Sequence, residues 1–456
     1  MNYREETDSM GTVRVPEDAL YGAHTCRAIQ HFSISGITLH KVFIKAAVRI
    51  KKAAARVNME LELIPRQQGE AIVLAAGEIM KGRFDDQFMI DVFQTGSATS
   101  TNMNVNEVIA CRANEILTGK GTAAGPVHPN DHVNKCQSTN DVIPSAIHIT
   151  AMELIESKLL PALCGLEEEL DSKARKFAGI KKIGRTHLQD AVVMTLGQEF
   201  SGYAEQMRLS QSRIKAAQNR LCRLALGGTA VGTGLNAHPE FAPRVIALIA
   251  EGTGLPFYEA ENHFEAQGAC DTAVETSGIL KTIAVSLSKT ANDIRWLASG
   301  PRCGLGEIRL PELLPGSSIM PGKVNPVICE AAIQACAHVI GNDASITHAG
   351  TGGYFELNLM LPLIAFKLTD SLEILAGAAD SVAKKCVSGI QADAEKCGQN
   401  VKKSLAVVTG LVPYIGYERA ARLAFRAYEE GKTIEQAALE ENIMDEAKLR
   451  KLLYND

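Results

Sequence analysis

The sequence predicts an all-α protein built around a bundle of long helices. Two observations predict it: long stretches lack proline, and apolar residues recur at steps of three and four positions. No proline occurs at positions 162–238, 257–300 or 327–361. Because proline breaks a helix interior, such stretches permit long helices.

Three apolar stripes have the spacing of a single helix face. They comprise Leu154, Ile155, Leu159, Leu163, Leu166, Leu170, Ala174 and Phe177; Leu196, Phe200, Tyr203, Met207, Ile214, Ala217 and Leu221; and Leu280, Ile283, Leu287, Ala291, Ile294 and Ala298. Pro161 lies within the first stripe, where we expect a kink or a break. Helices of this length bury their stripes against one another, so a bundle is the expected architecture.

The chain of 456 residues is long enough for about three domains. We expect a mixed, mainly helical N-terminal domain over residues 1–137, with turns rich in glycine, proline and asparagine. The central long-helix bundle is expected over 138–390. A charged segment of shorter period predicts a small C-terminal helical domain over 391–456.

Composition does not favour several kinds of partner. With 47 basic and 52 acidic residues the formal net charge is −5, which does not favour a nucleic-acid or membrane surface as partner. The 11 cysteines include no CxxC pair, which favours reduced thiols over a disulfide framework or a zinc site. The polar N-terminus lacks an apolar signal core, so we expect a cytoplasmic protein.

Four stretches are rich in small polar residues where a packed core would not favour them. They are residues 94–104, residues 128–132 with 137–141, residues 184–190, and residues 315–326. The first holds five hydroxyl side chains within seven residues, which suits either a solvated loop or a set of neutral donors to an anion.

The other three stretches also admit a structural and a functional interpretation. Ser138 and Thr139 precede a long helix, where they can cap it or help to bind an anion at its positive end. His187 follows Arg185 and Thr186, and a lone histidine is more often structural than catalytic. The fourth stretch is either an ordinary turn or a constrained functional loop in which Lys323 is the sole charge.

The fourth stretch resembles the signature loop of the aspartase/fumarase superfamily, GSSxMPxKxNP. Residues 316–326 match every fixed position, and the other three stretches resemble the family's remaining characteristic regions in the expected order. The resemblance covers the chain from Met10 to Tyr417. It implies a three-domain helical subunit, a homotetramer with one helical core, and active sites that each take residues from three subunits.

The resemblance also implies roles for individual residues. Ser317 resembles the catalytic base, which would take the Cβ proton as an oxyanion stabilised by backbone N–H groups and by Lys323. The groups that would hold the resulting aci-carboxylate are Lys323, Asn325, Ser138 and Thr139. The other carboxylate and the leaving group would be held by Thr99, Asn140, Thr186 and His187. Ser97 would be a further substrate-binding hydroxyl. Glu330 would orient His187, and a secondary dicarboxylate site would comprise His128, Asn130 and Asp131.

The motifs divide between two members of the superfamily. Thr139, where fumarases usually have a second serine, favours aspartase, whereas residues 95–97, 227–234 and 299–304 resemble fumarase. We therefore expect an aspartate ammonia-lyase that releases fumarate and ammonia by anti elimination. The alternative is a class II fumarate hydratase acting on malate and fumarate. Ala98 and Leu361 replace a glycine and a charged residue of both groups, and so leave a related succinyl substrate open.

Two further alternatives belong to other classes. One is a non-catalytic lens protein, against which the intact Ser317, Lys323, Asn325 and His187 argue. The other is an argininosuccinate- or adenylosuccinate-type lyase, which residues 184–190 disfavour. We expect no cofactor and no metal site, since no His, Cys, Asp and Glu cluster has ligand spacing, although a divalent ion activates some aspartases. The expected partner is a small C4 dicarboxylate, with no nucleic acid and no membrane.

Overall fold

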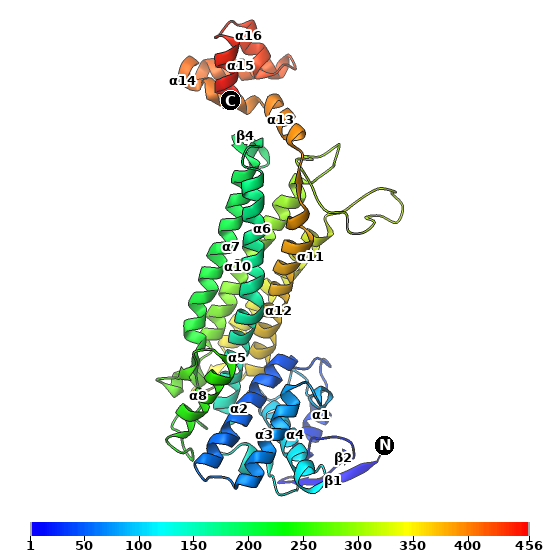
Figure 1. Cartoon of the computed structure of the whole chain (residues 1–456), viewed down its shortest axis with the longest axis vertical. Coiled ribbons are helices and arrows are strands. Elements are labelled where there is room, and N and C mark those ends of the chain that lie inside the picture. The colour runs from blue at the N-terminus through cyan, green and yellow to red at the C-terminus, as the bar shows by residue number, and fades with distance from the viewer. Residues whose placement is uncertain (1, 455–456) are drawn as a thin grey trace. The chain divides into compact units, whose positions relative to one another are not determined.

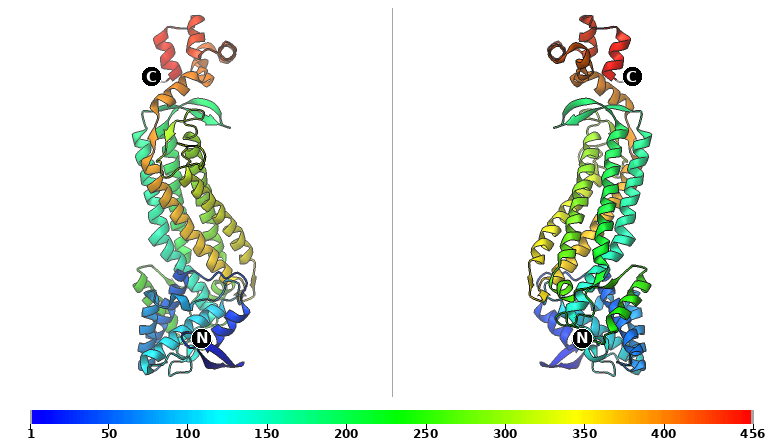
Figure 2. Two further views of the ribbon diagram at one scale, coloured as in Figure 1. Left: turned by 90° about the vertical axis from the view of Figure 1, so that its right-hand side faces the viewer. Right: turned by 90° about the vertical axis from the view of Figure 1, so that its left-hand side faces the viewer.

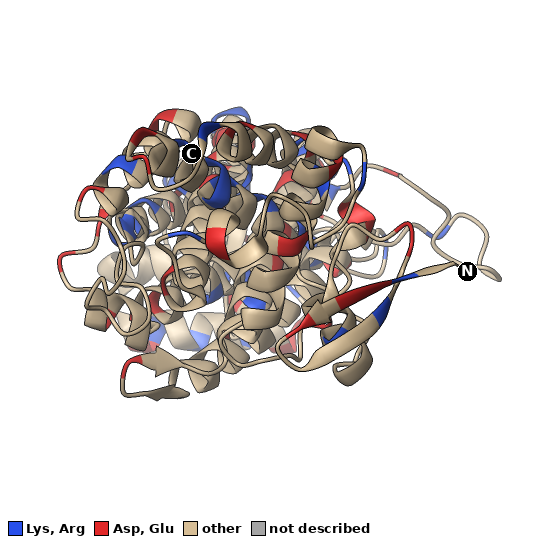
Figure 3. Ribbon diagram, turned by 90° about the horizontal axis from the view of Figure 1, so that it is seen from below, with Lys and Arg blue, Asp and Glu red and all other residues tan. Residues whose placement is uncertain are grey.

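The computed structural model describes residues 2–454, most of which lie in α-helices (Figure 1). Within that range the strands are short and pair only into two-stranded sheets. The predicted all-α fold is confirmed. None of the helices in this part of the chain is long and apolar enough to cross a membrane. Basic and acidic residues are interspersed along the ribbon, as Figure 3 shows.

Residues Met1–Pro161, Ser212–Ala284 and Ala337–Ala376 form one compact unit, and Ala162–Gln211, Val285–Cys336 and Gly377–Asp456 form another. We call them the first and second units. The three domain boundaries expected from the sequence stay predictions.

The elements of the chain up to the end of the first stripe are mainly helical. They are β1 (Tyr3–Asp8), β2 (Gly11–Pro16), α1 (Ala23–His31), α2 (Lys41–Glu60), α3 (Arg66–Met80), η1 (Asp85–Gln87), α4 (Thr99–Thr118), η2 (Pro129–Val133), α5 (Thr139–Leu154), η3 (Ile155–Leu159) and α6 (Leu160–Lys176).

The rest of the chain contains the other long helices and the short C-terminal ones. The elements are β3 (Lys181–Thr186), β4 (Gln189–Thr195), α7 (Leu196–Leu221), β5 (Arg223–Leu224), α8 (Phe241–Thr253), β6 (Tyr258–Glu259), α9 (His263–Gly268), α10 (Asp271–Leu297), β7 (Ile308–Arg309), α11 (Val327–Gly350), β8 (Gly353–Tyr354), β9 (Leu357–Asn358), α12 (Leu361–Lys385), η4 (Val387–Gly389), β10 (Gln391–Ala392), α13 (Ala394–Lys403), η5 (Leu405–Leu411), α14 (Val412–Ile415), α15 (Tyr417–Glu429), α16 (Ile434–Glu440) and α17 (Glu446–Tyr454).

The three apolar stripes are the buried faces of long helices. The second stripe coincides with α7, and all seven of its residues are buried. The third lies on α10, where only its last residue, Ala298, falls beyond the helix. The break expected at Pro161 is absent from the first stripe: α5, the π-helical turn η3 and α6 follow one another without a gap, and the π-helical turn lies just before Pro161.

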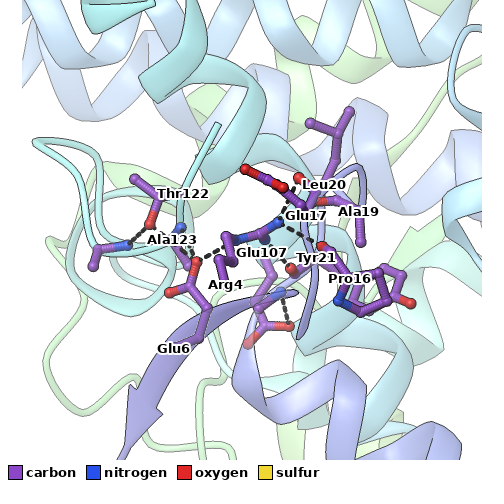
Figure 4. Close-up of polar contacts among 12 residues, drawn as sticks. Arg4, Glu6, Pro16, Glu17, Ala19, Leu20, Tyr21, Glu107, Thr122 and Ala123 are labelled. Carbon is purple, nitrogen blue, oxygen red and sulfur yellow. Dashed lines mark hydrogen bonds and ion pairs between the residues drawn. The ribbon is translucent and has the colours of Figure 1, made fainter. Parts of the chain in front are cut away.

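The first unit packs around α2, which contacts α3, α5 and α8. Its N-terminal hairpin, β1–β2, is fixed by Arg4, whose guanidinium donates to the carbonyl oxygens of Pro16, Ala19 and Tyr21 at 2.7–2.9 Å (Figure 4). Glu107 on α4 accepts hydrogen bonds from the N–H groups of three residues at the start of α1, Gly22, His24 and Thr25. These contacts hold α1 and the hairpin against α4.

In the second unit α6, α7 and α10 run alongside one another (Figure 1). Phe177 and Phe200 meet edge to face, and Phe200 meets Tyr203 in the same way. The Tyr203 hydroxyl donates to Asp293 on α10 at 3.1 Å. An apolar core joins Ile183 of β3 to the C-terminal helices, including Leu411, Leu423, Ile434, Leu449 and Leu453. This packing anchors the β3–β4 hairpin, which projects beyond the ends of α6 and α7 (Figure 2).

Candidate active site

The loop between β7 and α11 contains Ser317, Lys323 and Asn325, and its two ends are pressed together. The Gly316 N–H donates to the Lys323 carbonyl, and the Asn325 side-chain amide donates to the Gly316 carbonyl, both at 2.8 Å. A Cβ on Gly316 would lie 2.6 Å from the Lys323 carbonyl oxygen, so only glycine allows this closure. The loop extends away from the helices of its unit (Figure 1).

The Ser317 hydroxyl has a specific environment within this loop. Its Oγ accepts the N–H groups of Ile319 at 3.2 Å and Met320 at 3.0 Å. Two N–H donors on one oxygen stabilise negative charge there and so favour ionisation of the hydroxyl. The Lys323 side chain is exposed. In this chain the backbone therefore supplies the donors around Ser317.

His187 and Leu188 form the two-residue turn of the β3–β4 hairpin. Their φ angles are 55° and 60°, a left-handed conformation that non-glycine residues seldom adopt in such turns. Strained backbone of this kind tends to occur at functional sites. Thr186, His187 and Leu188 are exposed at the hairpin tip.

A buried ion-pair cluster supports this exposed turn. Glu307 is fully buried and accepts Arg185 at 2.6 Å and 3.0 Å. Lys182 lies 3.4 Å from the same carboxylate, and Asn400 donates to it at 3.2 Å. Burial alone would raise the pKa of Glu307, but the hydrogen bond from Arg185 and the charge of Lys182 outweigh burial and lower it. The cluster ties β3 to α13 and fixes the base of the hairpin.

Glu330, the expected partner of His187, lies in the first turn of α11 and is partly buried. Among the contacts of residues 2–454, no hydrogen bond or ion pair joins it to His187. Glu330 as the group that orients His187 therefore stays a prediction.

In the first unit, the hydroxyl-rich stretch forms the start of α4. Thr95 and Ser100 bond to each other, and Thr101 bonds to Gln94, so these hydroxyls serve local structure. Ser97 and Thr99 are different: both are partly exposed, and their hydroxyl oxygens lie 2.7 Å apart. The stretch is thus not the solvated loop of the first alternative, because its second half starts a helix, and the donor role of Ser97 and Thr99 stays a prediction.

Ala98 and Leu361, the two departures from the family pattern, both lie beside this pair. Ala98 is fully buried with a φ of 62°, a conformation that suits glycine better. Leu361 is also buried, and its N–H donates to the Gly96 carbonyl at 3.0 Å. An apolar residue fits that position because its side chain is out of contact with water.

Ser138, Thr139 and Asn140 start α5. Ser138 is the N-cap and forms a reciprocal capping box with Asp141, as the structural interpretation predicts. Asn140 donates to the Ala230 carbonyl at 2.8 Å. The Thr139 hydroxyl oxygen accepts from Nδ2 of Asn102 on α4 at 3.1 Å. Contacts of this kind bring the starts of α4 and α5, both positive helix ends, into one polar region.

The predicted secondary site lies beside a cavity of about 670 Å³ in the first unit. His128 and Asn130 line it together with residues from the β1–β2 turn and α1. Nδ1 of His128 accepts the N–H of Asp131 at 3.2 Å, which caps η2. The Asp131 side chain itself is largely exposed.

Sequence reasoning missed a polar network behind Thr139, formed by Lys51, Asn102, Asn106 and Asn134. One signal was present. Lys51 lies on the same helical face as the small or apolar residues Ala47, Ala54 and Ala55, where a solvated lysine is not expected.

The predicted site residues divide between the two units of the chain. Ser97, Thr99, Ser138, Thr139, Asn140, His128, Asn130 and Asp131 belong to the first unit, whereas Thr186, His187, Ser317, Lys323, Asn325 and Glu330 belong to the second.

Comparison with known protein families identifies the chain's relatives. A family model described as lyase matches residues 11–341, and one described as the fumarase C C-terminus matches residues 407–454. The chain belongs to the aspartase/fumarase superfamily. The predicted resemblance is therefore confirmed.

Individual superfamily members match along nearly the whole chain. A class II fumarate hydratase of Neisseria meningitidis is 53% identical over 441 residues, which are 96% of this chain and 95% of that one. The crystal structure of class II fumarase from Schistosoma mansoni superposes with a TM-score of 0.96 at 39% identity, covering 99% and 98% of the two chains. A structure titled fumarate lyase:delta crystallin, from Brucella melitensis, reaches 0.93 at 42% identity over 99% and 98%.

These relatives correct one prediction. We expected an aspartate ammonia-lyase, a carbon–nitrogen lyase, but relatives half identical over almost the full length are named fumarate hydratases, which are carbon–oxygen lyases. The preference rested on Thr139. Threonine and serine present the same hydroxyl, and the Thr139 hydroxyl oxygen accepts a hydrogen bond from Asn102, which a serine hydroxyl could accept as well. That position therefore does not distinguish ammonia from water.

Proposed function

We propose that this protein is a fumarate hydratase that interconverts L-malate and fumarate. The structural observation that carries the chemistry is the Ser317 hydroxyl, which accepts two backbone N–H groups in a closed loop. The similarity to class II fumarate hydratases over 96% of the chain supports the substrate.

In this mechanism Ser317 removes a Cβ proton from L-malate as an oxyanion. The electron pair left on Cβ delocalises into the adjacent carboxylate and gives an aci-carboxylate. Departure of the hydroxyl group from the neighbouring carbon, with a proton supplied to it, then gives fumarate and water. The aci-carboxylate carries negative charge that exists only after proton loss. Groups that bind this charge stabilise the intermediate more than the substrate, and so accelerate the reaction.

The other predicted residues would divide between the two ends of the substrate. Lys323, Asn325, Ser138 and Thr139 would hold the aci-carboxylate. The second carboxylate and the departing water would be held by Ser97, Thr99, Asn140, Thr186 and His187. Glu330 would orient His187, and His128, Asn130 and Asp131 would take a second dicarboxylate.

The working form would be a homotetramer whose sites each draw on several subunits. Large apolar side chains are exposed on the long helices of the single chain, among them Leu209 on α7, Val285 and Trp296 on α10 and Ile340 on α11. Such residues would be covered if these helices packed against other chains, and a contiguous apolar patch is what marks a surface of that kind. Light scattering of the purified protein tests the expected mass of four chains.

The test of the reaction is the ultraviolet absorbance of fumarate, followed with purified protein and either L-malate or L-aspartate. Turnover of L-malate in both directions, with none of L-aspartate, supports the proposal. Fumarate formed from L-aspartate but not from L-malate would overturn it.

A further inference from the structure

A fully buried lysine lies behind the start of α5. Lys51 on α2 has no exposed surface, and its Nζ lies 2.7 Å from Oδ1 of Asn134. Lysine is seldom fully buried without a partner. Burial lowers the pKa of Lys51 to about 7, against the opposing attraction of Asp141. Burying a charged group costs free energy that apolar packing does not return, so we expect a polar role for Lys51.

The Asp141 carboxylate, Lys51's electrostatic partner, is equally buried. It accepts the N–H groups of Ser138, Gly227 and Thr229 at 2.9–3.1 Å. Burial raises the pKa of Asp141 to about 6, although these N–H groups and Lys51 favour the charged form. The hydrogen bonds of Asp141 thus go to the start of α5 and to the loop after β5, whereas the Lys51 ammonium donates to Asn134.

Asn134 is fixed by contacts on both ends of its amide. Its Oδ1 accepts from Lys51, from Asn106 at 3.2 Å and from Asn102 at 3.3 Å, while its Nδ2 donates to the Gln137 carbonyl at 3.1 Å. The ammonium form of Lys51 only donates hydrogen bonds, and the Gln137 carbonyl only accepts them. Lys51 therefore forces the oxygen of Asn134 toward the asparagines of α4 and its nitrogen toward Gln137.

This orientation is passed on to Thr139. With the Asn134 oxygen facing it, Asn102 presents its NH₂ group, which also donates to the Thr139 hydroxyl oxygen at 3.1 Å. A hydroxyl group has one hydrogen. Since the Thr139 oxygen accepts from Asn102, its own hydrogen is left to point away from that amide, as a donor.

We propose that Lys51 is a positioning residue which, through Asn134 and Asn102, presents the Thr139 hydroxyl as a hydrogen-bond donor to a substrate carboxylate. This inference rests on the proposed function, in which Thr139 contacts the carboxylate that gains charge. Lys51 itself does not touch the substrate. Its effect is to fix the direction of one hydrogen bond.

The test is a double-mutant cycle between Lys51→Met and Thr139→Val, with initial rates for L-malate. We expect each single change to lower kcat about 10- to 100-fold, with KM changed by less than about threefold, because the lost interaction strengthens only after proton removal. The double variant should be no slower than Thr139→Val alone within about threefold, since both changes act through the same hydrogen bond.

The matched control is Lys173→Met. Lys173 is also a buried lysine, and it donates to the carbonyl oxygens of Ser388 and Ile390 in the second unit, away from this network. Its loss should lower the melting temperature and leave kcat unchanged. Fully additive effects of Lys51→Met and Thr139→Val, or a normal kcat for Lys51→Met, would overturn the proposal.

Two provisions keep the test decisive. If Lys51→Met does not assemble, Lys51→Gln replaces it in the cycle, because it removes the ammonium that donates to Asn134 and keeps a long polar side chain at this buried position. The wild-type protein is measured first. Absence of malate turnover there would refute the proposed reaction, whereas normal wild-type turnover with an additive cycle would refute only the role of Lys51.

Discussion

The Met320 N–H donates to the Ser317 hydroxyl oxygen at 3.0 Å, and the loop between them turns back on itself. Ile319 donates to the same oxygen at 3.2 Å. A hydroxyl that accepts two N–H groups has an environment suited to a negative charge. Both of these donors lie within the loop itself, two and three residues after Ser317.

Replacing Ser317 with alanine should lower kcat for L-malate by at least about a thousandfold, because the base itself is removed. The tetramer and its melting temperature should be unchanged, since Ser317 lies in a largely exposed loop. Ile319→Ala is the control: it trims a side chain that is 83% exposed and keeps the backbone donor. Near-normal turnover by Ser317→Ala would remove Ser317 from the role of base.

The helical part of the fold was predictable because it follows from local periodicity. The stripe from Leu196 to Leu221 matches α7 at both ends, since apolar spacing and the absence of proline act within one segment. The break expected at Pro161 did not follow, because a π-helical turn just before this residue lets the helical run continue through it.

The site was predictable only in its motifs. The positive φ of His187 depends on the pairing of β3 with β4, and the role of Asn134 depends on contacts with α2 and α4, far away in sequence. Neither pairing leaves a periodic signal. Substrate choice failed at Thr139 because serine and threonine offer the same hydrogen bond.

Replacing Ala98 with glycine should stabilise the protein by about 1 kcal/mol. Ala98 has a φ of 62°, which costs an L-residue with a Cβ roughly 1–2 kcal/mol, whereas the extra freedom of glycine in the unfolded chain returns part of that gain. The measurement is the free energy of unfolding from a urea titration. Ala98 is the N-cap residue of α4. Ala110→Gly, at a buried position in the interior of α4, should instead be destabilising. Two changes of the same sign would contradict this account.

The Asp91 carboxylate should make stability fall in acid. It accepts the N–H groups of Ile34, Ser35, Gly36 and Phe93, and the Ser35 hydroxyl. Burial alone would raise the pKa of Asp91, but these donors outweigh burial and lower it from 3.8 to about 2. Because the folded-state pKa is the lower one, the stabilisation is present above about pH 4 and is lost as the pH falls toward 2.

Asp91→Asn is the change that isolates this contribution. It should lower the free energy of unfolding by roughly 2 kcal/mol at pH 7, since an amide nitrogen replaces an oxygen that accepts N–H groups. The difference from wild type should shrink between pH 4 and pH 2 in urea titrations. A difference that stays constant over that range would show that the charge of Asp91 is not responsible.

Shared active sites predict that two inactive variants restore each other. Ser317 belongs to the second unit and Asn140 to the first, and we propose that each site takes these residues from different subunits. Ser317→Ala and Asn140→Ala should each be nearly inactive as homotetramers. In tetramers reassembled from an equal mixture, some sites receive Ser317 from one variant chain and Asn140 from the other. Random mixing makes such intact sites about a quarter of the total, so about a quarter of wild-type malate turnover should return. The control is each variant taken alone through the same unfolding and reassembly. Activity that stays at the level of the single variants, with mixed tetramers verified by mass spectrometry, would place both residues of a site on one subunit.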